Sequence, residues 1–404
     1  MTNTKIVAAP EIVWGEVPKK EALLEHLRAQ IVGGTWGARS QLPTRRELVK
    51  HYNVSLETVQ RALDCLTSDG WIESDGRRGT FVRENPPHLS RYALIFRHHP
   101  EHDEETWTRF YTAMSQEAAR LRQSHQKDVV VFTGVDGHVD SPDFVQLMRE
   151  VNAQRFAGLF FVDGIYGLEN SGLLELEGVP KVSIGQIPAR DCVPMRLDSH
   201  QFAARAVESL ARRGRTKLAL ICHCPLDAPW NPIYAHIAEQ ARAHGMRIEA
   251  HWSQVCSVLL SDSARGAANL LMHCRETPDA LIITDDNLVE PATLGLLDAE
   301  VQLGVDLDVV AHANFPYPTQ GHGALARLGF DVREIMERAL ASIDARRQGD
   351  FSLTEMHCVP RFSEEITLLN SQRAVGHPAL TGHPMLKSDR KSLRDSNREV
   401  LVPH

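Results

Sequence analysis

Apolar and polar positions follow a helical pattern at the start of the chain. Apolar residues recur at every third or fourth position between residues 19 and 32, which predicts an amphipathic helix ended by two glycines. Thr44 followed by Glu47 is a capping-box pattern and predicts a second, short helix. Ser55 is the predicted cap of a third helix, and two strand-like runs within residues 71–82 follow it. This order of elements predicts a winged helix-turn-helix domain.

The pattern changes after a proline-containing linker at residues 85–91, where short apolar runs begin to alternate with amphipathic segments. Such alternation is typical of parallel sheets covered by helices on both faces, and the length favours two lobes. The predicted fold class is therefore α/β: a winged helix-turn-helix over residues 19–84, then a two-lobed domain of parallel sheets flanked by helices over residues 92–368. The expected strands are 92–96, 129–132, 158–162, 180–184, 217–222, 280–283 and 307–310, and the expected helices are 107–123, 142–152, 201–213, 232–244, 264–273, 288–300 and 332–346.

Both ends of the chain lack this periodicity. Residues 1–18 are interpreted as a flexible arm and residues 369–404 as a disordered tail. The tail is basic, with its cationic residues at Lys387, Arg390, Lys391, Arg394 and Arg398.

Composition and charge narrow the class of protein. The chain has 404 residues, 43% of them hydrophobic, which excludes a disordered or fibrous protein. No run reaches the ~18 apolar residues of a membrane-spanning helix, and residues 1–18 lack the layout of a secretory signal. Seven cysteines without a disulfide-scaffold spacing favour a reducing compartment. We therefore expect a cytoplasmic protein with no membrane partner.

The net charge of −8 conceals an uneven distribution. Residues 19–83 hold 11 lysines and arginines against 8 aspartates and glutamates, whereas the rest of the chain holds 33 against 44. Charge is informative for each domain rather than for the whole chain, so a basic first module favours DNA as its partner.

Polar side chains on the predicted third helix and hairpin suit DNA recognition. Arginine and glutamine donate to base edges in the major groove, and arginines at a hairpin tip suit phosphates or the minor groove. The alternative is a solvated face on a small packing domain. The predicted DNA-binding residues are Thr44, Arg45, Arg46, Ser55, Glu57, Thr58, Gln60, Arg61, Arg77, Arg78, Gly79 and Thr80.

The first module resembles the GntR family of bacterial transcription regulators. The resemblance is carried by residues 41–48, by Asn53-Val54-Ser55 with Thr58-Val59, and by residues 79–82. It implies that Arg46 contacts DNA, that Ser55 and Thr58 hold phosphates, and that Gly79 allows a close approach of the wing. Leu56, Gln60 and Arg77 depart from the family's usual residues, so the operator sequence is not transferable from relatives.

The second part resembles the effector-binding domain of LacI-family regulators, which has the fold of periplasmic sugar-binding proteins. The ordered landmarks are residues 156–160, 178–182, 195–198, 278–286 and 305–310. A GntR-type head on a LacI-type body is an arabinose-repressor-like architecture. The resemblance implies two lobes crossed by the chain near residues 197–200, 324–331 and 357–361, with a small molecule bound between them.

Ligands of open α/β sheets bind beyond the carboxyl ends of the strands. This rule predicts effector-binding residues at Arg97, His98, Asp136, Asp163, Trp230, Asp285 and Asn314. Trp107 opens the first predicted helix of the body and offers a stacking face to a sugar, and the resemblance adds Trp252, whose position is aromatic in some sugar-binding relatives. Ala313 stands where the family often has an aspartate, and an expected arginine near Ile233 is missing or displaced. The sequence therefore leaves open whether the effector is a common sugar, an unusual sugar or another kind of small molecule.

Two alternatives remain open from sequence alone. Cys222 and Cys224, with His98 and His99, offer thiolate and imidazole ligands for a metal-sensing regulator. A winged head fused to an aminotransferase-like body would need a pyridoxal-binding lysine, and the candidates are Lys127, Lys181, Lys217 and Lys387. The favoured interpretation is a transcription regulator without enzymatic activity, cofactor or metal, acting as a repressor. It would bind a two-fold operator as a homodimer, because half-site symmetry mirrors protein symmetry.

Overall fold

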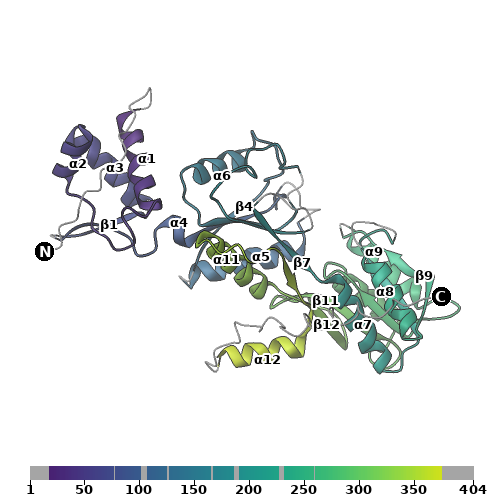
Figure 1. The fold of residues 1–404 in the computed structure, drawn as a ribbon. Helices are drawn as coiled ribbons and strands as arrows, with labels where there is room; N and C mark the ends of the chain where they lie inside the picture. Colours follow the sequence, from purple (N-terminus) through teal and green to yellow (C-terminus); the bar gives the residue numbers. More distant parts are fainter. Residues whose placement is uncertain are drawn as a thin grey trace, which may run out of the picture.

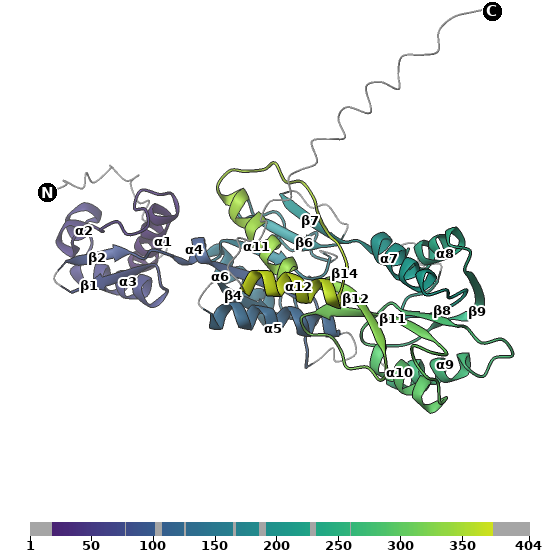
Figure 2. The same ribbon diagram turned by 90° about the horizontal axis from the view of Figure 1, so that it is seen from below.

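The computed structural model describes residues 18–76, 78–101, 107–124, 127–164, 167–185, 191–226, 232–258 and 260–374. Three folded units lie in a row: a small head at the amino-terminal end and two larger lobes (Figures 1 and 2). We call residues 18–84 the head and the two lobes together the body. The expected arm and most of the expected tail, with Arg77 and Trp230, lie outside the described residues.

The head is a winged helix-turn-helix, as predicted. It contains α1 (Lys19–Val32), α2 (Arg45–Tyr52) and α3 (Leu56–Ser68), followed by the antiparallel pair β1 (Ile72–Asp75) and β2 (Gly79–Val82). The Thr44–Glu47 capping box is present, and the Ser55 hydroxyl accepts a hydrogen bond from the Thr58 backbone N–H at 3.0 Å. These caps fix where α2 and α3 begin, and thereby the angle of the turn between them.

The first lobe, the N-lobe, is a parallel six-stranded sheet in the order β13-β7-β6-β5-β3-β4. Helices α5 and α11 pack on one face and α6 on the other, each against its own buried apolar cluster. Its elements are β3 (Arg91–Ile95), β4 (Asp128–Phe132), β5 (Gly158–Phe161), β6 (Lys181–Ile184), β7 (Cys192–Leu197), β13 (Met356–Cys358), α5 (Arg109–Gln123), α6 (Pro142–Asn152) and α11 (Val332–Arg347).

The second lobe, the C-lobe, has a sheet in the order β14-β12-β11-β10-β8-β9, parallel except for β14. Helices α7 and α8 cover one face, and α9 and α10 cover the other. Its elements are β8 (Lys217–Cys222), β9 (Arg247–Val255), β10 (Ala280–Ile283), β11 (Asp308–Phe315), β12 (Leu325–Asp331), β14 (Arg361–Phe362), α7 (Ser199–Arg212), α8 (Ile233–Ala243), α9 (Ser261–Leu271) and α10 (Val289–Asp298).

The chain passes between the lobes three times. It leaves the N-lobe after β7, returns from β12 to α11, and leaves again from β13 to β14. These passages coincide with the three crossings that the resemblance implied. The N-lobe is consequently built from two separate stretches of sequence.

Several elements were not expected from sequence. The strands β7, β9, β12, β13 and β14 were missed, and a short helix, α4 (Pro87–Ser90), lies in the predicted linker. The predicted start of a disordered tail at residue 369 is wrong, because α12 (Ser363–Ala374) continues through it. The hydrogen bonds of the Glu365 carboxylate with Arg205, both at 2.7 Å, hold this helix on the C-lobe.

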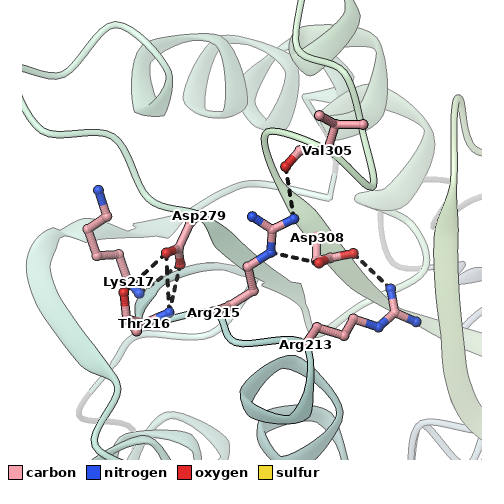
Figure 3. Close-up of polar contacts among 7 residues, drawn as sticks. All are labelled: Arg213, Arg215, Thr216, Lys217, Asp279, Val305 and Asp308. Atoms are coloured by element: carbon pink, nitrogen blue, oxygen red, sulfur yellow. Dashed lines mark hydrogen bonds and ion pairs between the residues drawn. The ribbon is translucent and has the colours of Figure 1, made fainter.

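Charged side chains fasten the amino ends of the C-lobe strands, at the opposite end from the carboxyl termini (Figure 3). Asp308 accepts hydrogen bonds at 2.7 Å from both Arg213 and Arg215, and Arg215 also donates to the Val305 carbonyl. Burial alone would raise the pKa of Asp308, but the bonds from the two arginines outweigh it and lower that pKa. Asp279 accepts from the backbone N–H of Thr216 in the same way. The carboxylates tie the loop before β8 to the sheet.

Candidate functional site

The helix α2 presents two free arginines to solvent. Arg45 and Arg46 open this helix, and both are exposed. Among the residues that the structure describes, neither forms an ion pair. The start of a helix also carries unpaired backbone N–H groups and the positive end of the helix dipole, which attract phosphate. Arg45 and Arg46 therefore lie, exposed, where the start of a helix favours an anion.

The predicted recognition residues of α3 contact one another in the absence of DNA. Arg61 pairs with Glu57 at 2.5 Å, and Gln60 donates to Asp64 at 2.6 Å. Exposed pairs of this kind contribute little free energy, of the order of 0.5 kcal/mol. The side chains can exchange these partners for base edges at small cost.

Gln41 fixes the wing to the rest of the head. Its side-chain amide donates to the Arg78 carbonyl at 2.8 Å, and its backbone bridges to Phe81. Gly79 has a φ of +126°, and a Cβ at this position would lie 2.6 Å from the Gln41 amide nitrogen. The turn thus requires glycine, and it holds Arg78 exposed at the tip beside the half-buried Thr80.

The head meets the body through a small joint. The Asp69 carboxylate, at the end of α3, pairs with Arg155 of the N-lobe at 2.5 Å and with Arg28 of α1 at 3.8 Å. The fully buried Trp71 stacks on His88, with ring centroids 5.1 Å apart. This joint gives the body a mechanical connection to the DNA-facing helices.

The two lobes meet at the carboxyl ends of their central strands. The Asn287 side chain, after β10, accepts a hydrogen bond from the Arg109 backbone N–H at 3.1 Å, and Glu290 pairs with the Arg109 side chain at 3.1 Å. Arg109 begins α5, which follows β3 in the N-lobe. We call the polar and aromatic residues around this junction the interlobe site.

Aromatic rings and one aspartate form the N-lobe side of the interlobe site. Trp107 lies 5.0 Å from Phe96 and 5.5 Å from Tyr111 between ring centroids, and His98 stacks on Tyr111. The Tyr111 hydroxyl donates to Asp163, whose other carboxylate oxygen is buried without a partner among the described residues. Burial raises the pKa of Asp163, opposed by the Tyr111 hydrogen bond. An aromatic face beside an open acceptor suits a polyhydroxylated ligand.

The C-lobe side is a buried polar pair beside an arginine. Asp286, only 2% exposed, accepts a hydrogen bond from the Asn314 side-chain nitrogen at 2.7 Å. Burial, reinforced by the neighbouring charge of Asp285, raises the pKa of Asp286 to about 7. The Asn314 carbonyl oxygen and one Arg327 nitrogen are buried without a hydrogen-bond partner in the described part of the chain. These buried polar groups are open to hydrogen bonds from a bound ligand.

Six of the predicted effector residues lie on the two sides of the interlobe site: Arg97, His98, Trp107 and Asp163 in the N-lobe, and Asp285 and Asn314 in the C-lobe. Asp136 follows β4, where its carboxylate is occupied by hydrogen bonds from the backbone and side chain of His138. The prediction for Trp252 is wrong: its ring is fully buried in the C-lobe core, and its Nε1 donates to the Glu276 carbonyl before β10.

Sequence reasoning missed other members of the interlobe site. The Asp285–Asp286 doublet after an apolar run was a usable signal for Asp286. Arg327 lies in β12, a strand that was not anticipated, so nothing marked it. Tyr111 fell in the interior of a predicted helix, where an aromatic residue is usually part of the core.

The alternative functions find no support in the described residues. They contain no group of three or more histidine, cysteine or acidic residues that could hold a metal ion. Cys222 is buried, which raises its pKa to about 12, and its thiol donates to the Cys224 carbonyl. Lys181 is fully buried and donates to the Leu176 and Val179 carbonyls, while Lys127 pairs with Asp344. These two lysines serve packing, and Lys217 begins a C-lobe strand away from the interlobe site.

The head matches a known family. Residues 19–82 match the family described as "Bacterial regulatory proteins, gntR family". The head thus has the helix-turn-helix of this family. Beyond the head, the similarity to curated proteins is weaker. The arabinose metabolism transcriptional repressor of Halalkalibacterium halodurans is 25% identical over 173 residues, which cover 40% of this chain and 44% of the repressor. The chain thus spans less than half the length of the curated relatives that it matches.

The body has the fold of LacI-family regulators. A LacI-family regulatory protein from Chloroflexus aggregans superposes with a TM-score of 0.53 and 15% identity, covering 67% of this chain and 96% of that one. A LacI-family regulator from Arthrobacter sp. FB24, in complex with lactose, gives 0.52 and 16%, covering 68% and 97%. At identities this low, the superpositions show the fold alone, which is that of a two-lobed, periplasmic-binding-protein-like domain. In the described ranges, no helix is long and apolar enough to cross a membrane.

Proposed function

We propose that this protein is a cytoplasmic transcription repressor whose GntR-type head binds operator DNA and whose body binds a carbohydrate at the interlobe site. It acts as a homodimer on a two-fold operator. The observation that carries the proposal is the pairing of a GntR-family head with a LacI-type body whose buried polar atoms at Asp163, Asn314 and Arg327 have no partner among the described residues.

The chemistry of the interlobe site supports a neutral sugar as effector. Hydroxyl groups both donate and accept, so they match the open oxygens of Asp163 and Asn314 and the open nitrogen of Arg327. Trp107 and Tyr111 offer an apolar face for the sugar ring. Polar atoms satisfied by such a ligand would regain the hydrogen bonds whose absence costs about 1–3 kcal/mol each.

The signal passes from the body to the head through the two contacts that join them. A ligand between the lobes changes their relative position only if it binds one arrangement more tightly than the other. The Arg155–Asp69 ion pair and the Trp71–His88 stack then transmit the change to α3. In a homodimer this alters the spacing of the two heads and thereby the affinity for the operator.

The test begins with operator selection by the full-length protein from fragmented genomic DNA, followed by titration of the recovered site at several salt concentrations. Arg46→Ala should weaken binding and reduce the slope of log K against log salt by about one, because one phosphate contact is lost. Arg212→Ala is the matched control, since Arg212 is an exposed arginine of α7 in the C-lobe. Unchanged binding in Arg46→Ala would refute the proposed DNA surface.

The effector is sought by a thermal-shift screen of the full-length protein with monosaccharides and disaccharides. A ligand at one hundred times its Kd stabilises the folded state by about 2.7 kcal/mol. The sugar that raises the melting temperature should also change operator affinity, and Asn314→Ala should abolish both effects. Operator binding that ignores every stabilising sugar would refute the carbohydrate assignment and leave the DNA-binding assignment intact.

A further inference from the structure

A thiol, an imidazole and a carboxylate lie in sequence at the C-lobe side of the junction. The Cys224 Sγ is 2.9 Å from the His223 Nε2, and the His223 Nδ1 is 3.2 Å from the Asp285 Oδ2. The other Asp285 oxygen accepts from the backbone and side chain of Asn287, at 2.8 and 2.7 Å. Asp285 is therefore held in place, and it orients the ring so that Nε2 faces the sulfur. Asp285 also belongs to the interlobe site, but the contacts proposed there for a carbohydrate use neither His223 nor Cys224.

The arrangement has the logic of an activated nucleophile. A carboxylate that accepts from Nδ1 fixes the tautomer in which Nε2 receives the thiol proton. The resulting thiolate–imidazolium pair is stabilised by the Asp285 charge, and the thiolate is the reactive form of cysteine. His223 and Asp285 act here as positioning and proton-accepting groups for the sulfur of Cys224.

The burial of Cys224 limits what reaches it. The residue is 2% exposed, whereas the His223 side chain beside it is 37% exposed. A sulfur this enclosed favours a small electrophile over a bulky one. Hydrogen peroxide is small and reacts with thiolates.

We propose that Cys224 is a peroxide-reactive thiol, activated by His223 and Asp285 at the junction of the lobes. The thiolate attacks one oxygen of hydrogen peroxide: the S–O bond forms and the O–O bond breaks. The departing hydroxide takes the proton held by the His223 imidazolium and leaves as water. Sulfur is oxidised by two electrons to the sulfenic acid, and the peroxide is reduced by the same two electrons.

Other thiols stand next to the modified sulfur. Cys222 donates to the Cys224 carbonyl at 3.3 Å, and the Cys256 backbone N–H donates to the Cys222 carbonyl at 2.7 Å, which places three cysteines at the ends of β8 and β9. Burial raises the pKa of Cys222 to about 12, so its thiol stays protonated and the sulfenic acid of Cys224 persists until an added thiol reductant restores it.

The titratable groups that face Cys224, His223 and Asp285 are neutral or negatively charged. From β9, Cys256 is neutral because burial raises its pKa. From β11, His312 is neutral because burial lowers its pKa to about 4. Asp286 adjoins Asp285 after β10, and burial brings its pKa to about 7. The Asp285 charge is the one that favours the imidazolium, so removal of that charge should move the pH profile of Cys224 reactivity.

The test compares cysteines within one chain. The full-length protein is exposed to hydrogen peroxide in slight excess, quenched, denatured and alkylated, and each cysteine-containing peptide is quantified by mass spectrometry over time. Cys65 and Cys274 are the internal controls, since both are free and only partly buried. An ordinary thiol is about 3% ionised at pH 7, so full ionisation accelerates Cys224 up to about 30-fold over these two. The product carries one added oxygen on Cys224.

The pH profile distinguishes activation from simple exposure. In the wild type, the rate at Cys224 should level off well below pH 8.5, the ordinary thiol range. His223→Asn should return the profile to that range, and Asp285→Asn should shift it part of the way. A rate at Cys224 no faster than at Cys274, or a wild-type profile that rises with an ordinary thiol pKa, would overturn the proposal. The wild-type profile decides the matter even where a variant fails to fold.

The assay contains neither DNA nor sugar. A failure here therefore leaves the proposed regulator function untouched, and a failure of operator binding leaves the reactivity of Cys224 to be judged on its own. Cys224→Ser must remove the modification, whereas Cys274→Ser must leave the rate at Cys224 unchanged. Oxidation confined to Cys65 and Cys274 would count against the site.

Discussion

Asp286 is predicted to lower the stability of the folded protein at neutral pH. Its carboxyl group is 2% exposed, lies next to the charged Asp285, and has its pKa raised from 3.8 to about 7. An acidic group whose pKa is raised on folding does not lower the stability of the folded protein at pH values below its pKa in the unfolded chain. The cost grows as the pH rises from about 4 and is complete above about 7. The substitution Asp286→Asn removes the charge while keeping an oxygen that can accept from Asn314.

The magnitude follows from the shift. Each unit of pKa corresponds to 1.36 kcal/mol, so a rise of about three units makes the ionised Asp286 cost about 4 kcal/mol at pH 8. Asp286→Asn should therefore stabilise the protein by up to ~4 kcal/mol at pH 8 and by nearly nothing at pH 4. Asp308→Asn is the control of opposite sign. Because the bonds from Arg213 and Arg215 lower the pKa of Asp308, its contribution is present above the unfolded pKa and is lost as the pH falls.

The measurement is urea unfolding of the wild type and both variants at pH 4.5, 6 and 8, followed by fluorescence and circular dichroism. The difference between Asp286→Asn and wild type should widen with pH, whereas Asp308→Asn should be destabilised by a nearly constant amount at these three pH values, because the pKa of Asp308 lies below 3.8 in the folded protein. The same Asp286→Asn protein should lose part of its response to the effector, since stabilising changes at binding sites often cost function. Parallel stability curves, or a destabilised Asp286→Asn at pH 8, would refute the reasoning.

Two further predictions concern the head. Gly79→Ala places a Cβ 2.6 Å from the Gln41 amide in a left-handed conformation, so we expect a loss of about 1–2 kcal/mol in the head and weaker operator binding, measured by unfolding and by titration; Gly34→Ala, with a left-handed φ but open space, should lose only the conformational part. Arg155→Ala removes the 2.5 Å pair with Asp69, and operator binding should persist while the effector response weakens. A full response in Arg155→Ala would show that this ion pair does not transmit the signal.

The head could be predicted almost completely from its sequence. Its signals are local: the Thr44–Glu47 capping box, the Ser55 cap and the glycines each act within one helical turn. The buried strands of the body were equally clear, because both faces of β5 and β10 are covered and their sequences are continuously apolar.

Elements whose environment depends on distant residues were not predicted. The edge strand β9 is exposed along much of its length, so it lacks an apolar run. The strand β12 contains the polar Arg327, which lies toward the interlobe site. This residue interrupts the apolar pattern, so the sequence of the strand resembles that of a loop. Trp252 was assigned to the ligand site from the resemblance alone, because its position is aromatic in some sugar-binding relatives, and the long-range packing that buries it in the C-lobe core has no local signal in the sequence.

The three passages between the lobes set the order in which the chain can fold during synthesis. The head consists of one continuous stretch and can fold as soon as it leaves the ribosome. The N-lobe cannot, because α11 and β13 complete its apolar cluster and sheet only after the whole central part of the C-lobe has been made. A truncation between the end of the head at residue 84 and Cys358 therefore leaves a folded head attached to an unfinished body. Such fragments would bind DNA without any means of release.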